Sequence, residues 1–161
     1  MRAIKPQRIA LAAALLILVV VVVVAGTGTA WAHALPRLLT QDGHNPFRVR
    51  PVTIGYTGDG TGYVGKFPIQ PHRGFLHWKV WNHQRAQGTA TIWLNNCTPS
   101  CAGGSFHSYR GSVRAFRVRH GDFTRMTLSF RYQGRSVTDE RGLVNTSSPD
   151  PSWGIIKQTG F

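Results

Sequence analysis

Two cysteines lie four positions apart in the stretch "NNCTPSCAGGSFHSY", residues 95–109. Three chemistries use such a pair: thiol redox exchange, zinc binding and a structural disulfide. A redox pair normally has the spacing Cys-x-x-Cys at a helix N-terminus, where the thiol pKa is lowered, and here the spacing is one residue longer. A zinc site needs about four ligands, and His107 and His120 do not complete a set. A disulfide between Cys97 and Cys101 that fixes a turn fits these residues best.

The same stretch offers a serine and a histidine, Ser105 and His107. A serine hydrolase needs a nucleophile, a histidine and an acid within reach, but the residues here do not match the Gly-x-Ser-x-Gly elbow. A glycosidase needs two carboxyl groups about 5 to 10 Å apart, and all six acidic residues fall in expected turns or loops. The seven histidines are not paired at metal-binding spacing. We therefore expect no catalytic residue, no metal ligand and no cofactor.

The beginning of the chain has the layout of a secretory signal peptide. Three basic residues precede an unbroken apolar run, residues 9–25, and small residues follow around Ala32. We expect a signal helix within residues 1–32, cleavage after Ala32 or Ala34, and a secreted protein. The alternative is a membrane anchor through residues 9–25, because that run is at the lower limit of a spanning helix.

The rest of the chain predicts an all-β fold. Residues 33–50 contain turn formers and no sustained period, so we expect a linker. From residue 51 onward, short runs rich in Val, Ile, Thr and aromatic residues alternate with Gly, Pro, Asn and Asp. We predict one β domain over residues 51–161. About six or seven short antiparallel strands would form a small β-sandwich or a closed barrel.

Alternation within two runs predicts which side chains face the core. In residues 74–82, Leu76, Trp78 and Val80 form the better core face, and Trp81 falls on the other side. In residues 123–132 the apolar face is clear, because Met126, Leu128, Phe130 and Tyr132 alternate with Arg125, Thr127, Ser129 and Arg131.

A basic hairpin is the best candidate ligand site. The chain has a formal net charge of +13, and clustered guanidinium groups attract polyanions. We expect a three-residue turn, His120-Gly121-Asp122, which sets Arg117 opposite Arg125 with Arg119 one step along. Like charges opposite each other are unfavourable in a sheet. Either a bound polyanion or salt screening of long side chains that splay apart would explain this arrangement, and the first makes Arg117, Arg119 and Arg125 the candidate anion-binding site.

The cysteine loop, together with "GFLHWKVWN" and "GTATIWL" before it, resembles a family of small secreted proteins of actinomycetes with a "W..W" strand and a "C.P.CA.G" loop. The resemblance covers residues 51 to 132. It differs in Asn82 and His83, which follow Trp81 where a glycine is usual. The resemblance implies a small β fold and a secreted protein, and it assigns no catalytic residue.

Two hypotheses of function follow from these observations. The first is a secreted, non-enzymatic β module that binds an anionic cell-wall polymer or a surface protein. The second is a small secreted hydrolase with its site near Ser105 and His107. A cleft in which His107 or His77 meets a carboxylate within hydrogen-bond reach would favour the hydrolase.

Overall fold

The computed structural model describes residues 34–40, 46–144 and 150–161, and within them the fold is all β with no helix. The prediction of an all-β protein is confirmed. The structure has ten described strands rather than six or seven, and four of them have ten or more residues. The strands are β1 (Leu38–Leu39), β2 (Phe47–Arg48), β3 (Thr53–Gly55), β4 (Gly62–Gly65), β5 (Leu76–Trp81), β6 (Arg85–Asn95), β7 (Phe106–Arg119), β8 (Asp122–Tyr132), β9 (Arg135–Val144) and β10 (Ser152–Thr159).

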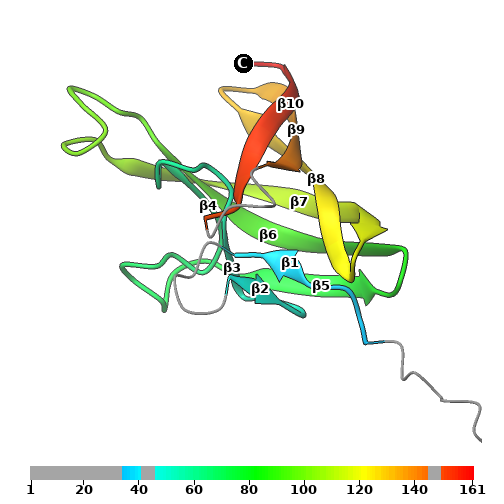
Figure 1. The fold of residues 1–161 in the computed structure, drawn as a ribbon. Coiled ribbons are helices and arrows are strands. Elements are labelled where there is room, and N and C mark those ends of the chain that lie inside the picture. Colours follow the sequence, from blue (N-terminus) through cyan, green and yellow to red (C-terminus); the bar gives the residue numbers. More distant parts are fainter. Residues whose placement is uncertain (1–33, 41–45, 145–149) are drawn as a thin grey trace, which may run out of the picture. The chain divides into compact units, whose positions relative to one another are not determined.

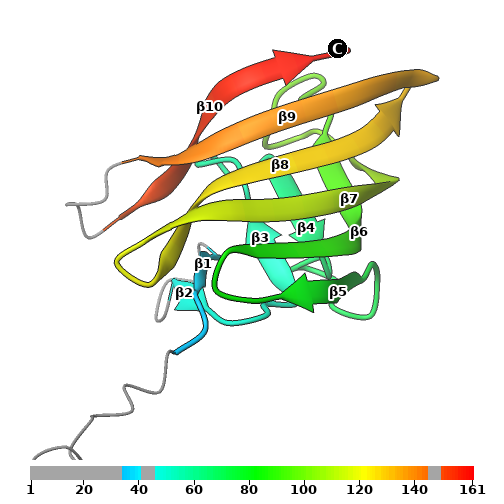
Figure 2. The same ribbon diagram turned by 90° about the vertical axis from the view of Figure 1, so that its right-hand side faces the viewer.

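One antiparallel sheet dominates the fold. Its strands follow the order β10-β9-β8-β7-β6-β4-β3, and β5 pairs with the first half of β6. Figures 1 and 2 show this sheet strongly curled, and in Figure 2 its strands β3 and β4 lie behind β6 and β7. Among the described residues, the end strands β10 and β3 are not paired with each other, so the sheet is a half-barrel and not a closed barrel.

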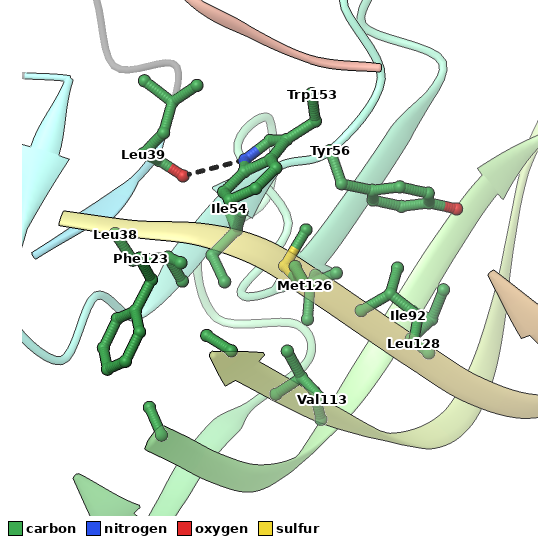
Figure 3. Close-up of a cluster of buried hydrophobic side chains, with 14 of the residues drawn as sticks. Leu38, Leu39, Ile54, Tyr56, Ile92, Val113, Phe123, Met126, Leu128 and Trp153 are labelled. Carbon is green, nitrogen blue, oxygen red and sulfur yellow. Dashed lines mark hydrogen bonds between the residues drawn. The ribbon is translucent and has the colours of Figure 1, made fainter. Parts of the chain in front are cut away.

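The concave side of this sheet holds the hydrophobic core. Met126 and Leu128 of β8 and Ile92 of β6 are fully buried there. Ile54 and Tyr56, from β3 and the residue after it, cover them from the opposite side (Figure 3). Because the residues between these core positions point the other way, we call the core side the inner face and the opposite side the outer face.

Part of the predicted linker belongs to the β domain. Leu38 and Leu39 are fully buried, and β1 pairs with β2. Two tryptophans fasten this segment to the domain through hydrogen bonds to its backbone: the Trp81 indole N–H donates to Pro36 O at 3.0 Å, and that of Trp153 donates to Leu39 O at 3.2 Å (Figure 3). The domain therefore begins before residue 51, because these leucines fill the core.

A β-bulge in β5 changes the predicted core face of this strand. The pairing with β6 shifts by one residue between Trp78 and Val80, so that Lys79 is the extra residue. An extra residue reverses the alternation beyond it. Trp81 therefore returns to the inner face, is only 7% exposed and packs edge-to-face on Phe123.

The β7–β8 hairpin has a different register from the predicted one. His120 and Gly121 both have positive φ, 52° and 83°, as a two-residue type I′ turn requires. Arg119 therefore pairs with Asp122, and Arg125 faces Phe116. The predicted three-residue turn is wrong, and so is the placement of Arg117 opposite Arg125.

Strand β9 contains Asp139 and Glu140, two acidic residues for which the sequence predicts turns or loops. Its inner face carries Val137, Asp139 and Arg141, all buried. The Asp139 carboxylate accepts hydrogen bonds at 2.8 to 3.0 Å from the Arg141 guanidinium, which also donates to Tyr56 O at 3.3 Å. Two of these three inner-face residues are charged, and they neutralise each other within the core. The sequence of this strand therefore lacks the apolar alternation that would predict a half-buried strand.

Candidate functional site

The cysteine loop is a stapled turn. Cys97 and Cys101 form a disulfide, as predicted, and the loop projects between β6 and β7 (Figure 1). The Asn95 side chain accepts from Cys97 N at 2.9 Å and donates to Cys101 O at 2.8 Å. Asn96 accepts from Ser105 N at 2.9 Å. The disulfide and these side-chain hydrogen bonds together fix the loop, which agrees with a structural role for the cysteines.

The groups of the hydrolase hypothesis are not assembled into a site in the described part of the chain. Ser105 and His107 are both exposed, at the base of the loop and the start of β7. His77 is exposed on β5. Neither histidine forms a hydrogen bond or ion pair with a carboxylate among the described residues. The geometry that would favour a hydrolase is therefore not seen there.

The described residues include no group of three or more His, Cys, Asp or Glu that could hold a metal ion. A hollow of about 1210 Å³ lies beside β3, lined largely by prolines, glycines and two aromatic rings. Thr40, Pro46 and Asp150 form part of its wall and adjoin the undescribed segments 41–45 and 145–149. We therefore assign no site to it.

The three predicted arginines are not equivalent in the structure. Arg117 and Arg119 are exposed near the tip of the β7–β8 hairpin, beyond the part of β7 that pairs with β6. Arg125 lies further along β8 and is half-buried. One of its guanidinium nitrogens lies 3.6 Å from Glu140 on β9. Arg125 is thus partly neutralised, whereas neither Arg117 nor Arg119 forms an ion pair with an acidic side chain among the described residues.

The outer face carries a larger set of basic residues that the sequence analysis did not collect. They come from β6, β7, β8 and β10, and β9 lies between the last two in the sheet. All but Arg125 are exposed. The sequence signal for this set is spacing: Arg110 and Arg114 lie four positions apart in β7, and Arg125 and Arg131 lie six positions apart in β8. Residues an even number of positions apart lie on the same face of a strand. The members are Arg85, Arg110, Arg114, Arg125, Arg131 and Lys157.

Acidic residues are almost absent from this face. By the strand registers and alternation, two acids of the described strands β5 to β10 lie off the inner face: Glu140 within the sheet, and Asp122 at the hairpin end, next to the buried Phe123. Asp122 is held by Arg37 at 2.8 Å, and Asp139 is buried on the inner face. Asp59 accepts a hydrogen bond from the Thr61 hydroxyl at 2.6 Å in the β3–β4 turn, which lowers its pKa. The outer face therefore has a strong excess of positive charge.

Two phenylalanines hold arginines of this face in place. The Arg110 guanidinium lies 5.6 Å from the ring centre of Phe75, and that of Arg114 lies 5.4 Å from the ring centre of Phe116. Arg131 donates to Gly134 O at 3.0 Å in the β8–β9 turn. Cation–π contacts restrict the side chains without neutralising them, so these charges remain available to a ligand.

Comparison of the chain with protein-family models, with curated proteins and with solved structures finds no match. Among the described residues, no helix is long and apolar enough to span a membrane. The predicted signal peptide and the alternative anchor, residues 9–25, lie outside the described residues. The disulfide is of the kind that persists in oxidising compartments outside the cytosol.

Proposed function

We propose that this protein is a secreted, non-enzymatic β module that binds an anionic polymer, such as an acidic polymer of the cell wall, through the outer face of its sheet. The observation that carries the proposal is the separation of charge between the two faces. Five arginines and Lys157 share the outer face with Glu140 and, at the hairpin end, with Asp122, which is already paired with Arg37. A field of one sign attracts polyanions and releases their counterions on binding.

The location outside the cell rests on the leader and the disulfide. The leader has the three parts of a signal peptide, and a structural disulfide fits an oxidising compartment. The resemblance to secreted actinomycete proteins agrees with this location. N-terminal sequencing of the protein from culture medium tests it: a chain that begins near His33 or Leu35 is expected, and a secreted chain that still begins at Met1 would contradict cleavage.

Two double variants of one strand test the binding face. Arg110→Gln/Arg114→Gln removes two charges from the middle of the outer face, and Arg117→Gln/Arg119→Gln removes two from the hairpin tip. The measurement is affinity for a poly(glycerol phosphate) chain at several salt concentrations. Each lost phosphate contact lowers the slope of log K against log salt by about one unit.

We expect the first variant to bind more weakly and with a slope smaller by about two units. The second variant is the matched control, because it has the same change in charge, and it should bind nearly as the parent does. If only the tip variant loses affinity, the site lies at the hairpin, where the sequence predicted it. If neither variant changes binding, the outer face is a solvated surface and the proposed function is wrong.

A further inference from the structure

A row of short hydroxyl side chains crosses the outer face between the arginines. Thr89 of β6 pairs with Ser112 of β7, Ser112 with Ser129 of β8, Ser129 with Thr138 of β9, and Thr138 with Thr159 of β10. His77 of β5 continues the row beyond Thr89. We call these six residues, five with hydroxyl groups and one histidine, the hydroxyl row. With neighbouring strands about 4.8 Å apart, the row extends for about 24 Å along the sheet, perpendicular to the strands.

The hydroxyls of this row are free to bind a ligand. None of the five Ser and Thr side chains forms a hydrogen bond with another described residue. A hydroxyl has one donor and two acceptor sites. The row is therefore able both to donate to anionic oxygens and to accept from the hydroxyl groups of a ligand.

Arginines flank the hydroxyl row on both sides. On β7, Arg110 and Arg114 lie two positions before and two positions after Ser112, and both side chains are held over phenylalanine rings. On β8, Arg131 lies two positions after Ser129 and is held by the turn at Gly134. Side chains fixed before binding lose less conformational entropy when a ligand arrives.

We infer that the hydroxyl row binds a linear polyol or glycan chain linked by phosphodiesters, lying across the strands. This inference rests on the proposed function and names the class of polymer. A phosphodiester has its charge within the chain itself, so arginines on both sides can reach successive phosphates. The guanidinium fork fits two phosphate oxygens at once. The row meets the hydroxyl groups between the phosphates.

A single-stranded nucleic acid fits this face less well. Such ligands bind through open aromatic rings on which bases stack. The two phenylalanines next to the row, Phe75 and Phe116, already have guanidinium groups over their rings. Bases would therefore have to displace Arg110 or Arg114 before they could stack.

The test removes hydroxyls without changing the charge. The triple variant Ser112→Ala/Ser129→Ala/Thr138→Val is compared with the parent for binding to poly(glycerol phosphate), to inorganic polyphosphate and to oligothymidylate. We expect the variant to lose affinity for poly(glycerol phosphate) about tenfold, with an unchanged salt slope, because only neutral hydrogen bonds are removed. Its affinity for polyphosphate, which has no hydroxyl groups between its charges, should fall much less, because only hydrogen bonds donated to anionic oxygens are lost.

The outcomes separate this inference from the proposed function. Equal binding of poly(glycerol phosphate) by parent and triple variant, while Arg110→Gln/Arg114→Gln weakens it, would overturn the hydroxyl row and leave the basic face intact. Tighter binding of oligothymidylate than of poly(glycerol phosphate) by the parent would replace the polyol phosphate with nucleic acid. The urea midpoint of each variant controls for folding, and all three substitutions are at surface positions of strands.

Discussion

The two faces of one sheet use arginine in opposite ways. On the inner face, Arg141 has a side chain that is 8% exposed, and both oxygens of Asp139 accept its hydrogen bonds. On the outer face, Arg110 and Arg114 are exposed and lie over phenylalanine rings with no acidic partner among the described residues. Buried charge must be neutralised within the fold, whereas exposed charge is solvated and remains accessible. The difference separates an arginine with a structural role from arginines that are accessible to a partner.

The inner-face ion pair also joins the two ends of the half-barrel. Arg141 belongs to β9 near one end of the strand order, and its bond to Tyr56 O reaches the segment between β3 and β4 at the other end. The Arg141 guanidinium lies over the Tyr56 ring, 5.2 Å from its centre. We expect this contact to stabilise the curvature of the sheet, which also sets the shape of the outer face.

The largest effect is expected when this pair is broken. Arg141→Met leaves the Asp139 carboxylate buried without its partner, which should lower the free energy of unfolding by about 3 to 5 kcal/mol. The measurement is urea unfolding followed by tryptophan fluorescence. The variant Asp139→Asn/Arg141→Met removes both charges and should recover at least half of the loss. A single variant within about 1 kcal/mol of the parent would show that the pair does not stabilise the curl.

A second prediction concerns the Tyr56 hydroxyl beside the same pair. This hydroxyl is buried and has no hydrogen-bond partner among the described residues, and its burial raises the Tyr56 pKa above the ordinary value. Because a buried, unsatisfied polar group costs about 1 to 3 kcal/mol, Tyr56→Phe should increase stability by about 1 kcal/mol. Thermal unfolding measures this, with Tyr63→Phe as the control. A clear decrease in the melting temperature would mean that the hydroxyl has a partner.

The outer face should behave in the opposite way to Arg141. Arg110→Gln/Arg114→Gln should lower the free energy of unfolding by only about 1 kcal/mol, because exposed cation–π contacts are weak and other effects of exposed substitutions are small. Urea unfolding of this variant next to Arg141→Met gives the comparison directly. A loss of 2 kcal/mol or more would make the outer arginines structural and remove the contrast between the faces.

The smallest effect is expected for the pKa of Asp59, whose carboxylate accepts a hydrogen bond from the Thr61 hydroxyl. The side-chain hydrogen bond from Thr61 is the main cause of the lowered Asp59 pKa. A depressed pKa stabilises the fold above the unfolded value, near 4, and this stabilisation is lost as the pH falls through the folded pKa. Thr61→Val should therefore raise the Asp59 pKa toward its ordinary value. A carboxyl NMR titration measures this, with Thr89→Val as the control that should leave it unchanged.

Much of the fold could be predicted because it depends on local patterns. The alternation of Met126, Leu128 and Phe130 identified the inner face of β8, and all three are buried. The cysteine spacing identified the disulfide. Both features depend on a few neighbouring residues. Side-chain alternation within one strand and a disulfide between nearby cysteines can both be recognised over that short range.

The rest could not be predicted, because it depends on pairing between distant residues. The alternation of β9 is hidden by Asp139 and Arg141, which are polar in sequence and core in the structure. The position of Trp81 depends on a bulge whose partner strand must be known. The arginines of the outer face share a surface only because the registers of β6 to β9 align them. A one-residue error in the hairpin turn was enough to pair the wrong arginines.

The central claim is that the outer face, and not the hairpin tip or the inner face, binds an anionic polymer. Amide chemical-shift mapping of the labelled protein during titration with poly(glycerol phosphate) tests it most directly. We predict that the largest shifts occur along Thr89, Ser112, Ser129 and Thr138 and at the neighbouring Arg110 and Arg114. Shifts confined to residues 117–121, or no shifts at concentrations where the polymer binds, would contradict the account.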